Sequence, residues 1–194
     1  MSDFPQKIKK RFPFISDEIL GHLLTLGELK MLNEGDVFIR EGEWSQKGAL
    51  VVEGIMRNYI INDNGEQVTV VFATEMQAIA PHATILLQKP ASETCEAIEP
   101  TILFVMDFVD FKKLFDVDPV YVRIYAEMLE ALLVSAVQRI EDFTNTKPVE
   151  RYQRLLETHG FLIERAPLKY LASYLGITPV SLSRIRKRLS KSRN

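Results

Sequence analysis

The feature that most constrains this 194-residue sequence is the stretch LKYLASYLGITPVSLSRIRKRL at residues 168–189. Ala172 is small enough for two helices to cross closely, and Gly176 suits a turn that needs a positive φ angle. Thr178 can cap a second helix, in which Pro179 would take the first position. Apolar residues then return at steps of three and four, at Leu182, Ile185 and Leu189. These offsets predict a helix-turn-helix.

Charge is distributed very unevenly along the chain. The formal net charge is −2, but residues 165–194 contain eight Lys and Arg and no Asp or Glu, so the preceding 164 residues carry −10. With its apolar residues inward, the second helix would turn its basic side chains outward, onto a surface that fits a DNA major groove. The alternative is an ordinary solvated hairpin with a charged face.

The expected contacts with double-stranded DNA fall into two kinds. Arg184 is expected to read a guanine through a bidentate contact, and Val180 and Ser183 are expected to touch base edges. Thr178, primarily a cap, is also expected to contact a phosphate. Phosphate contacts, which position a helix without reading sequence, are expected from Arg186, Lys187, Arg188 and Lys191. The full predicted set is Thr178, Val180, Ser181, Ser183, Arg184, Arg186, Lys187, Arg188 and Lys191.

The secondary structure expected for the rest of the chain changes at two points. Residues 1–32 are expected to be helical, with Ser16 and Asp17 as caps. From about 33 to 107, short β-branched and aromatic runs alternate with turn residues, among them the hairpin pair Asn64-Gly65. Such a pattern predicts an antiparallel sandwich or barrel. Helical spacing returns over 108–145.

A long helix is expected over about 118–145. Its apolar residues form two adjacent stripes, one at Val122, Tyr125, Leu129, Leu132 and Ala136 and the other at Tyr121, Ile124, Met128 and Ala131. So wide an apolar surface predicts pairing with the same helix of a second subunit; burial within its own chain is the alternative. Pro148 disfavours helix at Lys147, which predicts a hinge at 145–148. The predicted domains are residues 1–145 and 146–194.

Several functional classes are not expected. Cys95 is the single cysteine, so an intrachain disulfide framework is excluded. No window approaches the roughly 20 apolar residues of a membrane span, and no secretory signal is expected at the start, so a cytoplasmic protein is predicted. The three histidines are scattered, and no nucleophile and base are paired, so no metal, other cofactor or enzyme activity is predicted. A haem or metal role for His82 and a redox role for Cys95 stay open as alternatives.

A β jelly roll, a long helix and a C-terminal helix-turn-helix, in this order, resemble the Crp/Fnr family of bacterial transcription regulators. The resemblance is carried by EGDVFIREGE (34–43), GALVVEGIMRNY (48–59) and, most specifically, RAPLKYLASYLGITPVSLSRIRKRL (165–189). It implies an α+β fold with an N-terminal antiparallel β jelly roll of the cyclic-nucleotide-binding type, a long dimerisation helix and a C-terminal all-α helix-turn-helix domain. It also implies a homodimer on pseudo-palindromic promoter sites, RNA polymerase as a further partner, and Arg184 at the family's base-reading position.

The segment that corresponds to the family's nucleotide pocket departs from the family pattern. Ala78, Ile79 and Ala80 stand where the family has a Gly-Glu pair, and Ala91 stands in place of the phosphate-binding Arg, while Ser92 is retained. Burying a phosphate without a cation is costly, so no response to cAMP is expected unless Lys89 supplies the charge. The pocket should suit an unknown small-molecule effector, or be empty. The candidate pocket residues are Ala78, Ile79, Ala80, His82, Lys89 and Ser92.

Two further departures concern the DNA-binding end. Val180 replaces a Glu that is common in the family's recognition helix, so the target sequence is expected to differ. The five residues after Leu189 are too few for the family's usual strand pair against the DNA backbone.

Two alternatives stay open: a small-molecule-binding module whose basic helices dock on a protein partner, and a constitutive regulator with a filled core.

Overall fold

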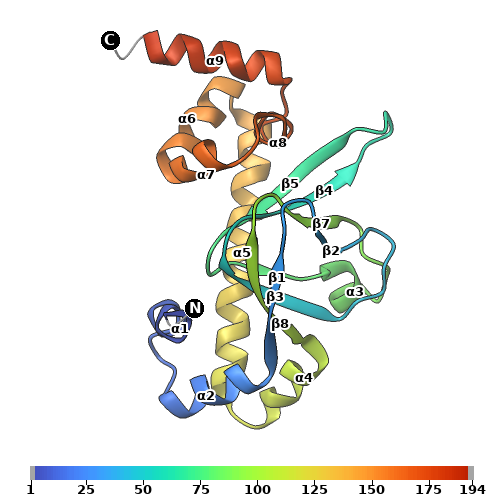
Figure 1. The fold of residues 1–194 in the computed structure, drawn as a ribbon, viewed down its shortest axis with the longest axis vertical. Coiled ribbons are helices and arrows are strands. Elements are labelled where there is room, and N and C mark those ends of the chain that lie inside the picture. The colour runs from blue at the N-terminus through green and yellow to red at the C-terminus, as the bar shows by residue number, and fades with distance from the viewer. Residues whose placement is uncertain (1–2, 192–194) are drawn as a thin grey trace. The chain divides into compact units, whose positions relative to one another are not determined.

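The strands are β1 (Gly27–Leu32), β2 (Val37–Ile39), β3 (Lys47–Glu53), β4 (Met56–Ile61), β5 (Gln67–Ala73), β6 (Ala78–Ile79), β7 (Thr94–Ala97) and β8 (Thr101–Asp107). These bounds are those of a computed structural model, which describes residues 3–191 (Figure 1). One sheet has the order β1-β8-β3-β6 and the other the order β2-β7-β4-β5. Strand β8 pairs antiparallel with β1 and β3, β3 with β6, and β2 with β7. The predicted antiparallel jelly roll is confirmed.

The described chain forms two compact units. The first combines the residues up to Asn58 with Phe72–Ala131, and the second combines Tyr59–Val71 with the residues from Leu132 onward. This division falls within the long helix, so the domain boundary predicted at 145–146 remains a prediction.

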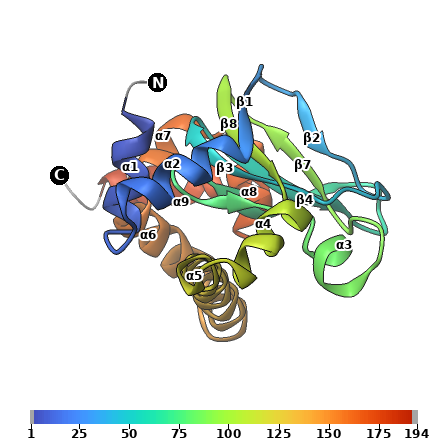
Figure 2. The same cartoon turned by 90° about the horizontal axis from the view of Figure 1, so that it is seen from below.

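The first unit holds the N-terminal helices and the start of the long helix. These are α1 (Phe4–Arg11), α2 (Asp17–Thr25), α3 (His82–Leu87), α4 (Phe108–Lys113), the 3₁₀ turn η1 (Leu114–Asp116) and α5, which spans Pro119–Asn145 in total. Helices α1 and α2 lie at one end of the strands and α3 at the other (Figures 1 and 2). The predicted cap Ser16 accepts a hydrogen bond from the Ile19 amide through its Oγ, at 3.1 Å.

Residues 27–32 correct one expectation. We expected helix through residue 32, but Gly27–Leu32 is strand β1, which pairs with β8 from Gly27 opposite Met106 to Leu32 opposite Thr101. Cross-strand pairing outweighs the local helical preference, as it commonly does for short segments. At Gly27 a Cβ would lie only 2.4 Å from the Val105 carbonyl oxygen, so this position needs a glycine.

The core of the first unit has two parts. One packs α1 and α2 against the sheet and the start of α5, and it includes the buried Tyr121 and Ile124. The other lies between the strands and contains Val51, Met56 and Leu103. Only the first turns of α5 are covered in this way, so the long helix is not wholly buried within its own chain.

The second unit contains the Tyr59–Val71 part of the β4–β5 hairpin, the rest of α5 and four further helices within the described residues. These helices are α6 (Pro148–Thr158), α7 (Gly160–Arg165), α8 (Leu168–Tyr174) and α9 (Pro179–Lys191). The break predicted at 145–148 is present, since α5 ends at Asn145 and α6 begins at Pro148. Across residues 3–191, no helix combines the length and the apolar character needed to cross a bilayer.

Candidate DNA-binding surface and candidate ligand pocket

Helices α8 and α9 have the local geometry that the sequence predicts. Gly176 has a φ angle of +67°, in the left-handed region that favours glycine. The Thr178 Oγ1 accepts a hydrogen bond from the Ser181 amide at 3.2 Å, so it caps α9. Ala172 and Leu182 are fully buried where the two helices pack. A helix-turn-helix is therefore formed.

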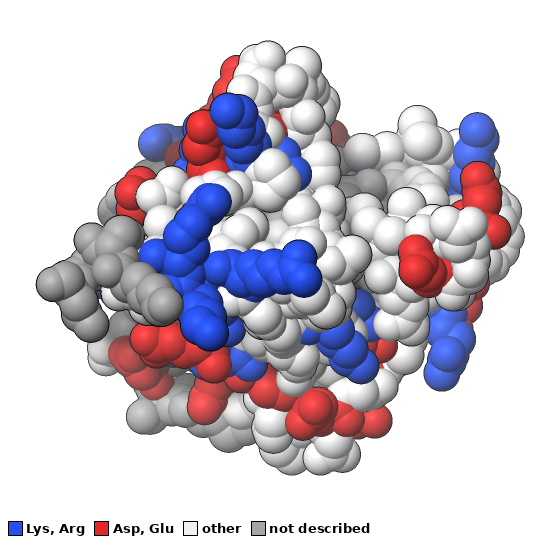
Figure 3. Space-filling view, turned by 90° about the horizontal axis from the view of Figure 1, so that it is seen from above, with Lys and Arg blue, Asp and Glu red and all other residues white. Residues whose placement is uncertain are grey.

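The outer face of α9 is polar and basic. Leu182 and Ile185 are buried, whereas Val180 is 60% exposed. The other exposed side chains of this face are Ser183, Arg184, Lys187 and Arg188. Viewed from the α9 end, Lys and Arg side chains gather on one face (Figure 3). We call Val180, Ser183, Arg184, Lys187 and Arg188 the α9 face.

The α9 face does not include three other predicted DNA-contacting residues, Thr178, Ser181 and Arg186. Arg186 differs from expectation, because its Nη2 donates to the Ile163 carbonyl at 3.3 Å and its guanidinium lies over the Tyr152 ring. It is half-buried and holds α9 on α7 rather than facing outward. Ser181 is also half-buried and takes part in the Thr178 cap. The Lys191 side chain lies outside the described residues.

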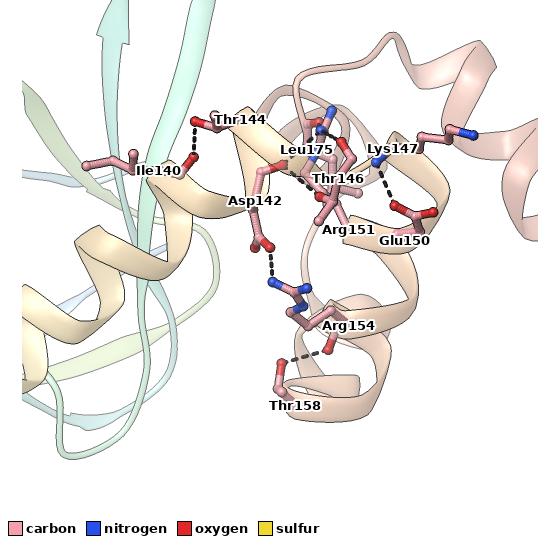
Figure 4. Close-up of polar contacts among 10 residues, drawn as sticks. All are labelled: Ile140, Asp142, Thr144, Thr146, Lys147, Glu150, Arg151, Arg154, Thr158 and Leu175. Atoms are coloured by element: carbon pink, nitrogen blue, oxygen red, sulfur yellow. Dashed lines mark hydrogen bonds and ion pairs between the residues drawn. The ribbon is translucent and has the colours of Figure 1, made fainter.

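Arg151 ties the break between α5 and α6 together (Figure 4). Its Nη1 donates to the carbonyls of Thr146 at 2.7 Å and Asp142 at 3.3 Å, and its Nε donates to the Leu175 carbonyl at 3.1 Å. Arg154 also pairs with the Asp142 carboxylate. The end of α5, α6 and the turn before α9 are therefore held as one joint, which the sequence analysis treated only as a hinge.

A second set of polar contacts joins the β4–β5 hairpin to α8, within the second unit. The Ser173 Oγ donates to the Thr69 Oγ1 at 2.9 Å and accepts from the Thr69 amide at 3.2 Å. Arg139 of α5 donates to the carbonyls of Thr69 at 3.1 Å and Tyr174 at 3.3 Å. Burial lowers the pKa of Arg139. We call Thr69, Arg139 and Ser173 the hairpin tie.

The hairpin tie was not predicted from the sequence. Thr69 and Ser173 are 104 residues apart, so no local pattern could pair them. The one available signal was Arg139, a cation on a helix that is otherwise mostly apolar between Ala131 and Ile140.

The first unit contains a small cavity of about 30 Å³ at the segment predicted to form the ligand pocket. Of the candidate residues, Ala80, His82 and Ser92 line it. Ile79 is buried in β6 and its neighbour Ala78 is exposed, while Lys89 is exposed; none of the three lines the cavity. The remaining lining residues are Ile39, Asn58, Pro81, Ala83, Ala91, Glu93 and Cys95.

The polar lining is acidic or neutral, because the cavity wall contains no Lys or Arg. Asn58 donates through its Nδ2 to the Glu93 Oε1 at 2.7 Å. Burial raises the pKa of Glu93, although the bond from Asn58 acts in the opposite sense, and burial lowers the pKa of His82. Burial also raises the pKa of the Cys95 thiol, with the charges of Glu93 and Glu96 adding to the effect, so the thiol stays protonated and unreactive.

A buried ion pair joins the sequence neighbours of two residues that line this cavity, Asn58 and Cys95. The Arg57 Nε donates to the Glu96 Oε1 at 2.7 Å, and the Arg57 side chain is 1% exposed. Arg57, Asn58 and Glu93 were not among the candidate pocket residues. Arg57 and Asn58 precede the expected pocket segment, and Glu93, which follows Ser92 within it, was expected to be solvated. Within residues 3–191, no group of three His, Cys, Asp or Glu side chains is arranged to hold a metal ion.

One family model agrees with this architecture. Residues 29–118 match the cyclic nucleotide-binding domain. The match covers just under half of the 194 residues and includes all the strands of the jelly roll from β2 to β8. No curated protein matches the sequence.

The fold is also similar to those of solved structures. FixK2 from Bradyrhizobium japonicum matches with a TM-score of 0.74 at 20% identity, over 86% of this chain and 85% of that chain. The c-di-GMP responsive global regulator CLP of Xanthomonas campestris matches with a TM-score of 0.73 at 13% identity, over 91% and 93%. The Thermus thermophilus catabolite activator protein matches with a TM-score of 0.58 at 18% identity, over 93% and 86%. These similarities confirm the predicted fold of a jelly roll followed by a long helix and further helices.

Proposed function

We propose that this protein is a DNA-binding transcription regulator of the Crp/Fnr type. The observation that carries the proposal is the α9 face, which presents Arg184, Lys187 and Arg188 on the second helix of a helix-turn-helix. A domain that matches the cyclic nucleotide-binding family and the fold shared with FixK2 and CLP support the same assignment. We also propose that the protein has no catalytic activity and binds no cofactor. We propose that it acts in the cytoplasm.

Recognition of DNA would use both kinds of contact. Arg184 carries five N–H donors in a planar fork, which suits the two acceptors that guanine presents in the major groove. Val180 and Ser183 would contact base edges beside it. Lys187 and Arg188 would pair with phosphates and set the register of the helix. The Thr178 end of α9 would meet a phosphate through its free amides. We leave Arg186 out of the proposed contacts.

The acting form would be a homodimer. The second half of α5 exposes six large apolar residues, at Leu132, Leu133, Val134, Val137, Ile140 and Phe143. Leu133, Val137 and Ile140 follow the spacing i, i+4, i+7 and so share one side of the helix. Pairing of this stripe about a twofold axis would bring two α9 helices to successive major grooves about 34 Å apart on a palindromic site. RNA polymerase is a further proposed partner at such a promoter.

Cyclic AMP is not the proposed effector. A cavity of about 30 Å³ is far below the roughly 300–1,000 Å³ of usual ligand pockets. Its wall also lacks the cation that a buried phosphate requires. An effector could change DNA affinity only by binding one arrangement of the dimer's two helix-turn-helix units, here called heads, better than the other arrangement.

The test is the affinity for random duplex DNA over a series of salt concentrations. Three or four phosphates neutralised by each head would give a log–log slope of about −6 for a dimer. A slope near zero, with retained binding to protein partners, would instead favour the alternative in which the basic helices dock on a protein. Selection of bound fragments from genomic DNA would then give the operator sequence, and fragments without twofold symmetry would argue against the dimer.

A further inference from the structure

The cavity next to β4 contains a buried acceptor that has no partner. Asn58 is 8% exposed and lines the cavity, and its Oδ1 makes no hydrogen bond within the described residues. Its Nδ2 donates to the Glu93 Oε1 at 2.7 Å. An ionised carboxylate only accepts hydrogen bonds, so the amide nitrogen must face Glu93 and the oxygen must be the unpaired atom. A buried acceptor in this position calls for a donor that enters the cavity.

The wall of the cavity also carries an uncompensated negative charge. Glu93 is the single formally charged residue among those that line it. The buried cation that precedes Asn58 in the sequence, Arg57, does not line the cavity and donates to Glu96. His82 is neutral at physiological pH, because burial lowers its pKa, so one ring nitrogen can accept a hydrogen bond. The cavity therefore offers a carboxylate, an amide oxygen and an imidazole nitrogen, all acceptors, to whatever occupies it.

Size restricts the occupant further. A volume of about 30 Å³ has room for a few water molecules at most, since about 10–15 Å³ of such space is enough for one. Only a particle of roughly that size, or the head of a longer molecule, can enter. A nucleotide or another anion is excluded both by the size of the cavity and by Glu93.

We propose that this cavity binds a small cation with N–H donors, namely ammonium or the ammonium head of a primary amine. The N–H groups would donate to Glu93, to the Asn58 Oδ1 and to His82, and the positive charge would compensate Glu93. Potassium has a similar charge but no directed donors, so it would bind more weakly. The role of this binding as a regulatory signal rests on the proposed function, but binding itself is measured without DNA. The two proposals can therefore fail separately.

The experiment measures thermal unfolding of the full chain with methylammonium chloride, ammonium chloride, potassium chloride or tetramethylammonium chloride at constant ionic strength. We expect the melting temperature to rise with ammonium and methylammonium, in the saturating manner of a ligand that binds the folded state alone. Tetramethylammonium, which has no N–H group and is too large, should give no rise. Equal curves in all four salts, as expected if the cavity holds only water, would overturn the proposal. So would a rise with cyclic AMP alone.

Two variants locate the effect. Glu93→Gln keeps the hydrogen bond from Asn58 and removes the charge, so we expect it to weaken methylammonium binding about tenfold or more, in line with the loss of a charged hydrogen bond. The matched control is Glu41→Gln, an exposed position outside the cavity, which should bind as the native protein does. Calorimetric titration of the native chain gives a second readout that does not depend on either variant. Identical affinities in Glu93→Gln and Glu41→Gln would place the cation elsewhere and overturn the assignment.

Discussion

Arg184 and Lys187 are both exposed on α9, but we expect Arg184 to read a base and Lys187 to contact a phosphate. Replacing Arg184 with Ala should relax base preference at one position of the operator, at a cost of about 1–3 kcal/mol for the preferred base. Replacing Lys187 with Ala should weaken binding to all sequences and reduce the salt slope by about one unit per head. Binding assays with the selected operator, its single-base variants and random duplex would separate the two effects.

The matched control is Lys89→Ala, which removes an exposed cation that belongs to the first unit and not to the helix-turn-helix. We expect it to leave both base preference and salt slope unchanged. If Arg184→Ala and Lys187→Ala had the same effects on base preference and on slope, the proposed division between base reading and phosphate contact would be wrong.

Glu93 should impose a pH dependence on the stability of the first unit. Because burial raises its pKa above the ordinary value of 4.5, the folded state holds the proton more tightly than the unfolded state. Its contribution to stability is therefore present at low pH and is lost as the pH rises from 4.5 through the raised pKa. Glu93→Gln cannot ionise, so the native protein should lose stability relative to this variant as the pH increases.

Urea unfolding of both proteins between about pH 4 and pH 8, in potassium salts without ammonium, measures this difference. His82 and the other titrating groups are common to both proteins and largely cancel in the comparison. A difference in unfolding free energy that stays constant over this range would contradict the assigned direction of the Glu93 pKa.

Between elements, the hairpin tie is the contact whose strength can be tested most directly. Ser173→Ala removes both hydrogen bonds between the Ser173 hydroxyl and Thr69, a residue with no exposed surface. Loss of hydrogen bonds to buried groups typically costs about 1–3 kcal/mol, so we expect destabilisation of that size. Chemical unfolding gives the total, and hydrogen exchange of the Thr69 amide should show faster exchange at the tie itself.

Ser190→Ala serves as the control, because the exposed Ser190 hydroxyl donates to the Lys187 carbonyl of its own helix. Its effect should stay within about 0.5 kcal/mol. If both serine variants unfolded at the same denaturant concentration, the β4–β5 hairpin would contribute nothing to holding α8.

The elements differ in how well the sequence predicts them. Helices α8 and α9 were predicted nearly residue by residue, because Gly176, Thr178 and Pro179 act on their immediate neighbours. Strand β1 was mistaken for helix, because its conformation is set by pairing with β8, some 75 residues further along the chain. A phosphate contact was also expected from Arg186, although its position depends on the carbonyl of Ile163 in α7.

The candidate pocket shows the same limit. Its segment was located from the resemblance, and Ala80, His82 and Ser92 of that segment line the cavity. The residues that give the cavity its chemistry, Asn58 and Glu93, lie 35 positions apart and meet only through the pairing of β4 and β7. No spacing in the sequence could have indicated that contact.

For the molecule as a whole, assembly through α5 is the property to test. Ile140 is 67% exposed and Val137 is 45% exposed on the stripe proposed to pair. Ile140→Lys places a charge at the centre of that contact, so we expect a folded monomer that binds a palindromic operator at least tenfold more weakly. Analytical ultracentrifugation would give the oligomeric state, and circular dichroism would show that the helices remain.

Gln138→Lys provides the comparison, since Gln138 is exposed on the same helix but lies off the stripe. It should remain dimeric with unchanged operator affinity. A native protein that sediments as a monomer at all concentrations tested would remove the basis for the twofold model.

The exposed apolar stripe of α5 has a consequence for how a regulator that acts as a dimer would behave in a cell. If two copies must dimerise before they can bind an operator, the occupancy of the operator rises with roughly the square of the protein's concentration. Synthesis and degradation would then set the response alongside any effector, and a modest change in copy number would become a sharp change in promoter output.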